Sequence, residues 1–378
     1  AYIPSWIASK MPALTDPTYN SSKHQSYVDG PTDVSEALVG TSWKTVLLSS
    51  TGGGGQGVFA LDVSNPATFS ASNVMWEFTD RDDPDLGNVM GTPRVVKIQT
   101  NKKAILPTDP APVYEWFAVV PSGVNNFVAD GFVSTTKKPH LFLLSLNKTA
   151  GTAWVKGSNY FKFEVTTDDT LSTTVSPGVI NFDATTGSSG ELDQLYMGDL
   201  HGNLWKLDFD NASSGTSGKN LASLTFSDLI AGTSYKPLFV AKDDAGNVQP
   251  IAITPKLVFG PNKGTIVMFG TGKYLESSDN NLTPVRTQSV YAINDIEVGG
   301  SSPKFVAGRA FLKKGTSVAG VISVDDFIWG RAGSASDSTQ RSGWYFDYAT
   351  AGERSVSDFT VSGTKVYFGS VVPPQNLT

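Results

Sequence analysis

The 378-residue sequence contains no cysteine. Thiol catalysis, zinc bound by thiolates, iron–sulfur clusters and disulfides are therefore excluded for this chain. Histidine is also scarce, and the three that are present, His24, His140 and His201, lie far apart along the sequence. This spacing argues against a multi-histidine metal centre. We expect each histidine to lie in a turn or at the surface.

Charged residues make up only 17% of the chain, and the formal net charge is -6. Neither lysine nor arginine forms a run longer than two residues. The sequence therefore lacks the basic patch that attracts phosphate backbones, and nucleic acid is not an expected partner. Long apolar runs are missing too, so we expect no transmembrane segment and a soluble domain that is part of a longer protein.

Helical periodicity is weak, although residues 221–230 favour a short turn of helix. What is abundant is glycine, with 37 residues, together with 21 prolines and 11% aromatic residues. This balance is typical of many short strands joined by tight turns. We expect an all-β fold with less than about a tenth of its residues in helices.

Five segments repeat one pattern, in which a β-branched or aromatic run leads into a glycine-containing turn and a second run. They occupy residues 45–66, 115–148, 192–211, 264–295 and 343–371. Their spacing of roughly 50 to 80 residues fits propeller blades with additional strands better than βαβ units. We therefore predict one β-propeller domain over residues 1–378, with seven modified blades, or six, and quinoprotein-like repeats.

The repeats also predict which residues are buried. Six side chains alternate within the strand patterns and are expected in the core: Val58, Phe59, Leu61, Leu204, Trp205 and Leu207. Trp43, Trp76 and Trp116 are expected to pack between sheets in the same way. The run Gly52–Gly55 lacks a following Gly-Lys-Ser/Thr and a helix, so we interpret it as a surface hairpin loop and not a phosphate-binding loop.

Several aspartates end strands or occupy turns. Asp199 lies in the turn GDLHGN, where a carboxylate accepts backbone N–H bonds, and Asp62 and Asp208 end strands at matching places. We expect structural roles for all three. Arg81–Gly87 concentrates Asp82, Asp83 and Asp85 around a proline, and this loop is either a second cation site or, as we favour, a solvated loop.

The order of the motifs resembles the C-terminal β-propeller domain of the PilC/PilY family, which comprises type IV pilus biogenesis factors and tip adhesins of bacteria. The motifs are HQSYVDGP, WKTVLLSS with GQGVFALDVSNP, VMWEFTDRDDPDLGNVMGTP, GDLHGNLWKLD, FGTGKYLESSD and GWYFDYATAGERSV. They extend from His24 to Val371. The family's opening Gly-Ala-Asn-Asp-Gly turn and its later cysteine-containing segment are both absent, so we expect a fragment that lacks an N-terminal region.

The resemblance implies a calcium loop before the strand that ends in Gly198-Asp199. The equivalent stretch is NFDATTGSSGELDQLYMGD, in which Asp183 and Asp193 match the first and last acidic ligands, with Thr185 and Glu191 between them. Calcium prefers six to eight oxygen ligands, and this loop is longer and poorer in charge than the family pattern. We therefore expect weak calcium binding or its loss, in which case Asp183 and Asp193 only cap turns.

The resemblance also implies a non-enzymatic module for pilus assembly, twitching motility and attachment to host cells or surfaces. Its expected partners are pilins or minor pilins and an unidentified receptor, at the outer membrane and pilus tip. The alternative is a pyrroloquinoline-quinone dehydrogenase, because quinoproteins share the propeller and the Ala-Leu-Asp strand endings. Such enzymes commonly carry a vicinal cysteine pair, which this chain lacks. A structural propeller of a surface lattice is a third possibility.

Overall fold

The computed structural model describes residues 2–101, 107–127, 132–210, 219–281, 284–296, 304–318, 321–337, 339–363 and 365–374. Strands account for 38% of the described residues and helices for 12%. The helical share is slightly above the expected tenth, and most of it consists of short 3-10 turns. The one α-helix of the described residues, α1 (Phe226–Leu229), lies in the segment for which the sequence predicts a helical turn.

Three four-stranded sheets form successive antiparallel meanders, in which each strand pairs with the next one in the chain. The first contains β1 (Thr32–Val39), β2 (Ser42–Ser50), β3 (Gly57–Asp62) and β4 (Val74–Thr79). The second contains β5 (Arg94–Gln99), β6 (Tyr114–Pro121), β7 (His140–Ser145) and β8 (Tyr160–Glu164). The third contains β9 (Val179–Thr186), β10 (Leu192–Asp199), β11 (Asn203–Asp208) and β12 (Phe239–Val240).

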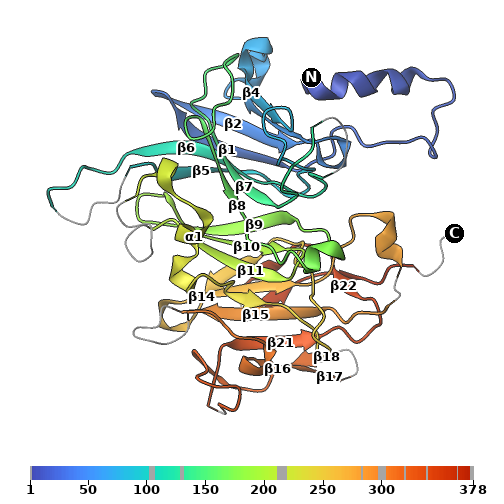
Figure 1. The fold of residues 1–378 in the computed structure, drawn as a ribbon, viewed down its shortest axis with the longest axis vertical. Helices are drawn as coiled ribbons and strands as arrows, with labels where there is room; N and C mark the ends of the chain where they lie inside the picture. Colours follow the sequence, from blue (N-terminus) through green and yellow to red (C-terminus); the bar gives the residue numbers. More distant parts are fainter. Residues whose placement is uncertain are drawn as a thin grey trace.

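A fourth sheet has five strands in the order β13-β14-β15-β21-β16. These are β13 (Lys256–Phe259), β14 (Thr265–Gly270), β15 (Ser289–Asp295), β21 (Gly343–Asp347) and β16 (Lys313–Lys314), of which only β16 runs parallel to its neighbour. Figure 1 shows the four sheets following one another in sequence order along the long axis of the molecule. This succession of meanders is the arrangement expected of propeller blades.

The remaining elements are short, except for η1, a 3-10 helix of 11 residues. Two-stranded pairs are formed by β17 (Thr316–Val318) with β18 (Val321–Ser323), β19 (Ile328–Trp329) with β20 (Gln340–Arg341), β22 (Arg354–Ser355) with β25 (Ser370–Val371), and β23 (Thr360–Ser362) with β24 (Lys365–Tyr367). The 3-10 turns are η1 (Ser5–Thr15), η2 (Gly52–Gly54), η3 (Pro66–Thr68), η4 (Ala71–Asn73), η5 (Leu171–Thr173), η6 (Leu221–Ser223), η7 (Ala231–Thr233), η8 (Pro261–Lys263), η9 (Ser277–Asn280) and η10 (Arg309–Phe311). The two-stranded pairs do not form complete blades of four strands, so the predicted number of six or seven blades stays a prediction.

The core lies between successive sheets. One apolar cluster joins the first and second sheets, where the rings of Phe78 and Phe142 are 5.5 Å apart. A second cluster joins the second and third sheets, and a third cluster joins the third and fourth. The six side chains predicted for the core are all buried, none of them more than 5% exposed. The alternation of the strand patterns thus identified the buried faces correctly.

Asp199 locks the β10–β11 hairpin as the sequence predicts. Its Oδ1 accepts the backbone N–H groups of His201 and Asn203, both at 2.9 Å. Its Oδ2 accepts hydrogen bonds from the Asn203 amide and the Trp205 indole, both at 2.8 Å. Four donors therefore satisfy a carboxylate that is buried in the turn. Asp62 and Asp208 likewise accept the N–H groups of Ser64 and Asp210 two residues on.

In the first sheet, two predictions about burial are wrong. Trp43 is 64% exposed, because it lies on β2 close to the β1–β2 turn, and β1 is an edge strand. Trp76, in contrast, is buried as predicted. Gly52 and Gly54 are buried although their run is a hairpin loop, because the N-terminal segment covers them. A Cβ atom at Gly54 would lie 1.9 Å from the carbonyl oxygen of Tyr27, so this approach requires glycine.

Candidate functional site

A cavity lies where loops from all four sheets meet. It has a volume of about 670 Å³, and we call it the central cavity. Gly53 of the β2–β3 loop, Asn88 before β5, Ser176 before β9 and Lys273 after β14 all contribute to its wall. No local motif predicts such a cavity, because its wall is assembled from chain segments that are far apart in sequence.

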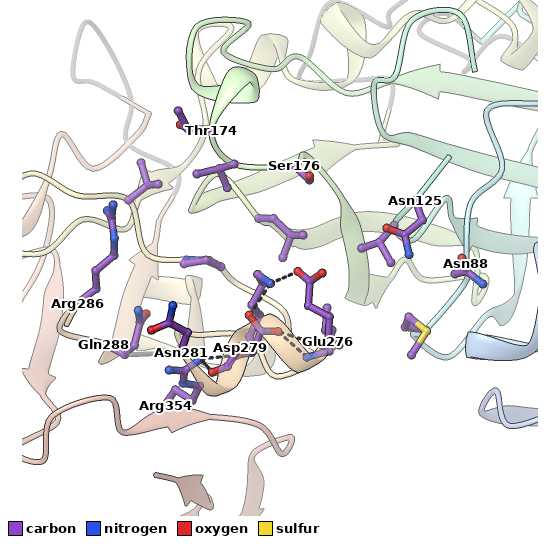
Figure 2. Close-up of a pocket in the computed structure, with 18 of the residues that line it drawn as sticks. Asn88, Asn125, Thr174, Ser176, Glu276, Asp279, Asn281, Arg286, Gln288 and Arg354 are labelled. Carbon is purple, nitrogen blue, oxygen red and sulfur yellow. Dashed lines mark hydrogen bonds and ion pairs between the residues drawn. The ribbon is translucent and has the colours of Figure 1, made fainter. Parts of the chain in front are cut away.

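Charged side chains gather at one end of the central cavity, as Figure 2 shows. Lys273 Nζ lies 2.5 Å from carboxylate oxygens of both Glu276 and Asp279. The second oxygen of Asp279 accepts the backbone N–H groups of Leu275 at 2.8 Å and Glu276 at 3.2 Å. The carboxylate of Asp279 is thus fully engaged by its own loop. Lys273 and Asp279 belong to the motif FGTGKYLESSD, and Arg354 belongs to the motif GWYFDYATAGERSV.

Two arginines at the same end make no direct ion pair with a carboxylate of the described residues, although the charge of Asp279 acts on Arg354. Arg354 donates from Nη1 to the carbonyl oxygens of Lys273 at 2.9 Å and Asp279 at 3.2 Å, and from Nε to that of Gly352. Partial burial lowers the pKa of Arg354. Arg286 is exposed, and within the described part of the chain it makes no hydrogen bond or ion pair. Three cations therefore face two carboxylates at this end.

The predicted calcium loop is a hairpin formed by β9 and β10. Asp183 and Thr185 lie on β9, Asp193 lies on β10, and Glu191 precedes β10 in the turn. Thr185 Oγ1 approaches Asp193 Oδ2 at 3.4 Å, so these two residues are brought together. Glu191 instead folds back on its own turn and accepts the N–H of Ser189 at 2.8 Å.

Two cations of β5 occupy the oxygens that a metal would use. Arg94 Nη1 lies 2.6 Å from Asp183 Oδ1, and Lys97 Nζ donates to the carbonyl oxygen of Ser189 at 2.8 Å. In the described residues no three His, Asp or Glu side chains converge in a way that suits a metal ion. As arranged, the side chains of this hairpin do not form a calcium site. Weak binding of calcium by this loop stays a prediction.

The acidic loop Arg81–Gly87 is only partly solvated: Asp82 is exposed as expected, whereas Asp83 and Asp85 are buried, contrary to our expectation. Asp83 and Asp85 are 3% and 7% exposed, and Lys162 Nζ bridges them at 2.8 and 2.5 Å. Tyr160 also donates to Asp83 at 2.8 Å. The ammonium group of Lys162, on β8, thus occupies the position that a bound cation would take. It reaches this position because the second sheet packs against the loop.

The histidines are more buried than predicted. His140 is 3% exposed, and its Nε2 lies 3.4 Å from Asp85 Oδ2. Burial lowers the pKa of His140, which favours the neutral ring. His201 lies in a turn as expected, yet it too is buried, and only His24 is exposed.

The chain matches the family model of the PilY1 beta-propeller domain over residues 3–311. It is 31% identical to a type IV pilus biogenesis factor PilY1 homolog of Xylella fastidiosa, with 99% of this chain and 23% of that protein covered. It is 32% identical to the type IV pilus biogenesis factor PilY1 of Pseudomonas aeruginosa PAO1, with 99% and 31% covered. The chain thus spans less than a third of these relatives.

A solved structure is similar as well. The crystal structure of the Pseudomonas aeruginosa PilY1 C-terminal domain matches with a TM-score of 0.65 and 27% identity, over 96% of this chain and 71% of that one. Together with the family model, this match confirms the β-propeller fold predicted from the repeats. The chain therefore belongs to the PilY1 family and corresponds to its β-propeller domain.

Proposed function

We propose that this propeller is a non-enzymatic module of a type IV pilus biogenesis factor that promotes pilus assembly and surface attachment. The observation that carries the proposal is the similarity to named pilus biogenesis factors along 99% of the chain. Loop-built faces of a rigid propeller suit the binding of other proteins. Pilins or minor pilins are the proposed partners, with a receptor of unknown identity on host cells or surfaces.

The proposed location is the cell surface, at the outer membrane and the pilus tip. Within the described residues, none of the helices has the length and apolar character needed to span a membrane. Residues 1–378 match less than a third of the length of these relatives. The export and anchoring of the whole protein are therefore part of the proposal.

The proposal is tested by deleting residues 1–378 from the full-length gene in the bacterium that encodes it. We expect fewer surface pili by electron microscopy, reduced twitching and reduced adhesion, all restored by the intact gene. Immunoblotting of the truncated protein controls for its level. A truncated protein that is present at a normal level in cells with normal pili, twitching and adhesion would show that the assignment is wrong.

A quinone-dependent dehydrogenase is the second candidate, and the central cavity is the observation that favours it. Among the described lining residues, however, Phe127 is the one aromatic side chain, which is little surface for stacking a planar quinone. The protein is to be mixed with pyrroloquinoline quinone and Ca²⁺ and assayed for cofactor absorbance and alcohol-dependent dye reduction. Turnover would replace the binding-module proposal.

A further inference from the structure

Residues 2–10 cover the face of the first sheet that points away from the second sheet. Phe59 lies on this face, because its neighbour Val58 on β3 belongs to the apolar cluster shared with the second sheet. The ring centroids of Tyr2 and Trp6 lie 4.9 and 6.4 Å from that of Phe59, which is only 5% exposed. Residues 2–10 thus shield an aromatic side chain that β3 would otherwise present to water.

Polar contacts and a glycine fit the same segment to the sheet. Glu77 on β4 accepts hydrogen bonds from the Tyr2 hydroxyl at 2.5 Å and from the backbone N–H of Ser5 at 2.7 Å. Gly57 leaves room for an indole, since the three atoms nearest to a Cβ atom added there all belong to Trp6, the closest at 2.4 Å. We call this surface the docking face, and it consists of Gly57, Phe59 and Glu77.

A protruding loop joins the docked segment to the first sheet. Among the described residues, 11–25 form hydrogen bonds and ion pairs, apart from the turns of η1, only with one another and with Tyr27. Both ends of the loop meet at Gly54, which accepts from Lys10 Nζ at 2.5 Å and donates to Asp29 Oδ1 at 3.2 Å. Figure 1 shows η1, in dark blue, joined to the first sheet by a chain that loops outward. Straightening this loop breaks no contact between the sheets.

These features are what the exchange of an identical element between two copies requires. Residues 11–25 span at most about 50 Å when fully extended, which is enough to reach the first sheet of an adjacent copy. The docking face of that copy is complementary to the incoming segment, because it holds the same side chains within one chain. The closed and exchanged forms then share their docking contacts, and they differ in the loop and in the entropy of association.

We propose that residues 2–10 form an exchangeable segment, through which two copies of this chain dock on each other's first sheet. Each copy supplies its Tyr2 and Trp6 to the docking face of the other, so the contact is reciprocal and closes as a symmetric pair. The inference rests on the docking face and the loop, and it is independent of any role in pili.

Light scattering coupled to size-exclusion chromatography tests the exchange on residues 1–378. Within one copy the segment docks at an effective concentration on the order of 1 mM, so we expect monomers in dilute solution. Incubation at about 1 mM in mild urea, which loosens the segment, should give dimers that persist after dilution into buffer. A chain that stays monomeric after this treatment would overturn the proposal.

Two complementary variants show whether the segment itself is exchanged. Trp6→Ala has an intact docking face and a weakened segment, whereas Gly57→Ala has an intact segment and a face that clashes with the indole. We expect neither variant alone to dimerise, and a mixture to form a heterodimer in which the segment of Gly57→Ala docks on the face of Trp6→Ala. Native mass spectrometry, with one variant labelled with ¹⁵N, identifies this heterodimer.

Tyr235→Ala is the matched control, because it removes an aromatic side chain that is 67% exposed and lies outside the docking face. It should dimerise as the wild type does. Thermal unfolding by circular dichroism verifies that each variant is folded. Dimers of Trp6→Ala or Gly57→Ala alone at the wild-type level, or a mixture of the two without heterodimer, would show that the copies do not exchange this segment.

Discussion

At the residue scale, Lys162 shows how a charge pattern that suggests a metal site is satisfied without one. Its ammonium group is bound by Asp83 and Asp85, and all three side chains are largely shielded from water. The surface pair of Lys138, just before β7, and Glu164, on β8, makes a useful contrast, with Nζ and Oε1 3.1 Å apart. Burial makes the two pairs differ in energy, since removing one partner of a buried pair leaves an uncompensated charge.

We predict that Lys162→Met lowers the free energy of unfolding by about 3 to 5 kcal/mol at neutral pH. Lys138→Met removes the same charge from the surface and should cost less than about 1 kcal/mol. Urea denaturation followed by tryptophan fluorescence measures both. Equal losses in the two variants would mean that the buried cluster contributes no more than a surface pair.

The same cluster makes stability depend on pH. Burial opposes ionisation of Asp85, yet hydrogen bonds from Lys162 and Ser134 hold its pKa below the ordinary value, and burial lowers the pKa of His140. A group whose pKa is lower in the folded than in the unfolded protein stabilises the fold at any pH above its unfolded pKa. This contribution is lost as the pH falls through its folded pKa. Unfolding free energy should therefore decline below about pH 6.5 as unfolded histidine takes up protons, and again below about pH 4.

Denaturation curves from pH 8 to pH 3 check this dependence, with Lys162→Met measured in parallel. Without the lysine, protonation removes the cost of burying charged Asp83 and Asp85. The difference in unfolding free energy between the wild type and Lys162→Met should therefore become smaller toward pH 3. A constant difference across the whole range would show that the carboxyls remain ionised without their partner.

At the element scale, the β9–β10 hairpin is held by strand β5 of the neighbouring sheet. Arg94 binds Asp183 and Lys97 binds the carbonyl of Ser189 across the boundary between the second and third sheets. Lys97 also forms a backbone bridge with Glu191. These contacts fix the turn without a metal ion, and they compete for the oxygens that calcium requires.

We predict that calcium binds this hairpin no more tightly than about 10⁻⁵ M, and that Arg94→Gln strengthens binding because it frees Asp183. Isothermal titration and thermal shift measure the affinity, since a bound ion raises the melting temperature by mass action. Asp193→Ala should abolish any heat that the wild type gives. Equal binding by wild type and Asp193→Ala would place the ion outside the hairpin.

At the scale of the whole molecule, glycines permit the close approach of neighbouring sheets. Gly91, before β5, lies where a Cβ atom would be 1.9 Å from the carbonyl oxygen of Ile180 on β9. Gly123 approaches Asn88 in the same way, with a Cβ-to-oxygen distance of 1.8 Å. Backbone atoms on both sides leave no flexible side chain to yield. At Gly91, the contact between the second and third sheets therefore leaves no room for a side chain.

We therefore predict that Gly91→Ala destabilises the domain by at least about 2 kcal/mol, through overpacking of backbone against backbone. Gly333→Ala is the matched control, because its Cβ atom would meet nothing within 4 Å. Thermal unfolding by circular dichroism compares the two. A melting temperature for Gly91→Ala equal to that of Gly333→Ala would show that the sheets can separate at this contact at little cost.

The sequence by itself determined the β-sheet class, the hairpins and the family. Alternation along a strand and turn chemistry depend on neighbours a few residues away, so the buried positions of β3 and β11 and the role of Asp199 followed directly. The motifs identified the family because they occur in the family's order along nearly the whole chain.

Only the tertiary structure decided how charges are paired and which loops are covered. Lys162 lies 79 residues from Asp83, and Arg94 lies 89 residues from Asp183, so neither pairing is visible in a local pattern. The burial of Gly54 under Tyr27 and the exposure of Trp43 depend equally on what packs nearby. The central cavity is the extreme case, because its wall is assembled from loops of four sheets and exists only once the sheets are arranged around it.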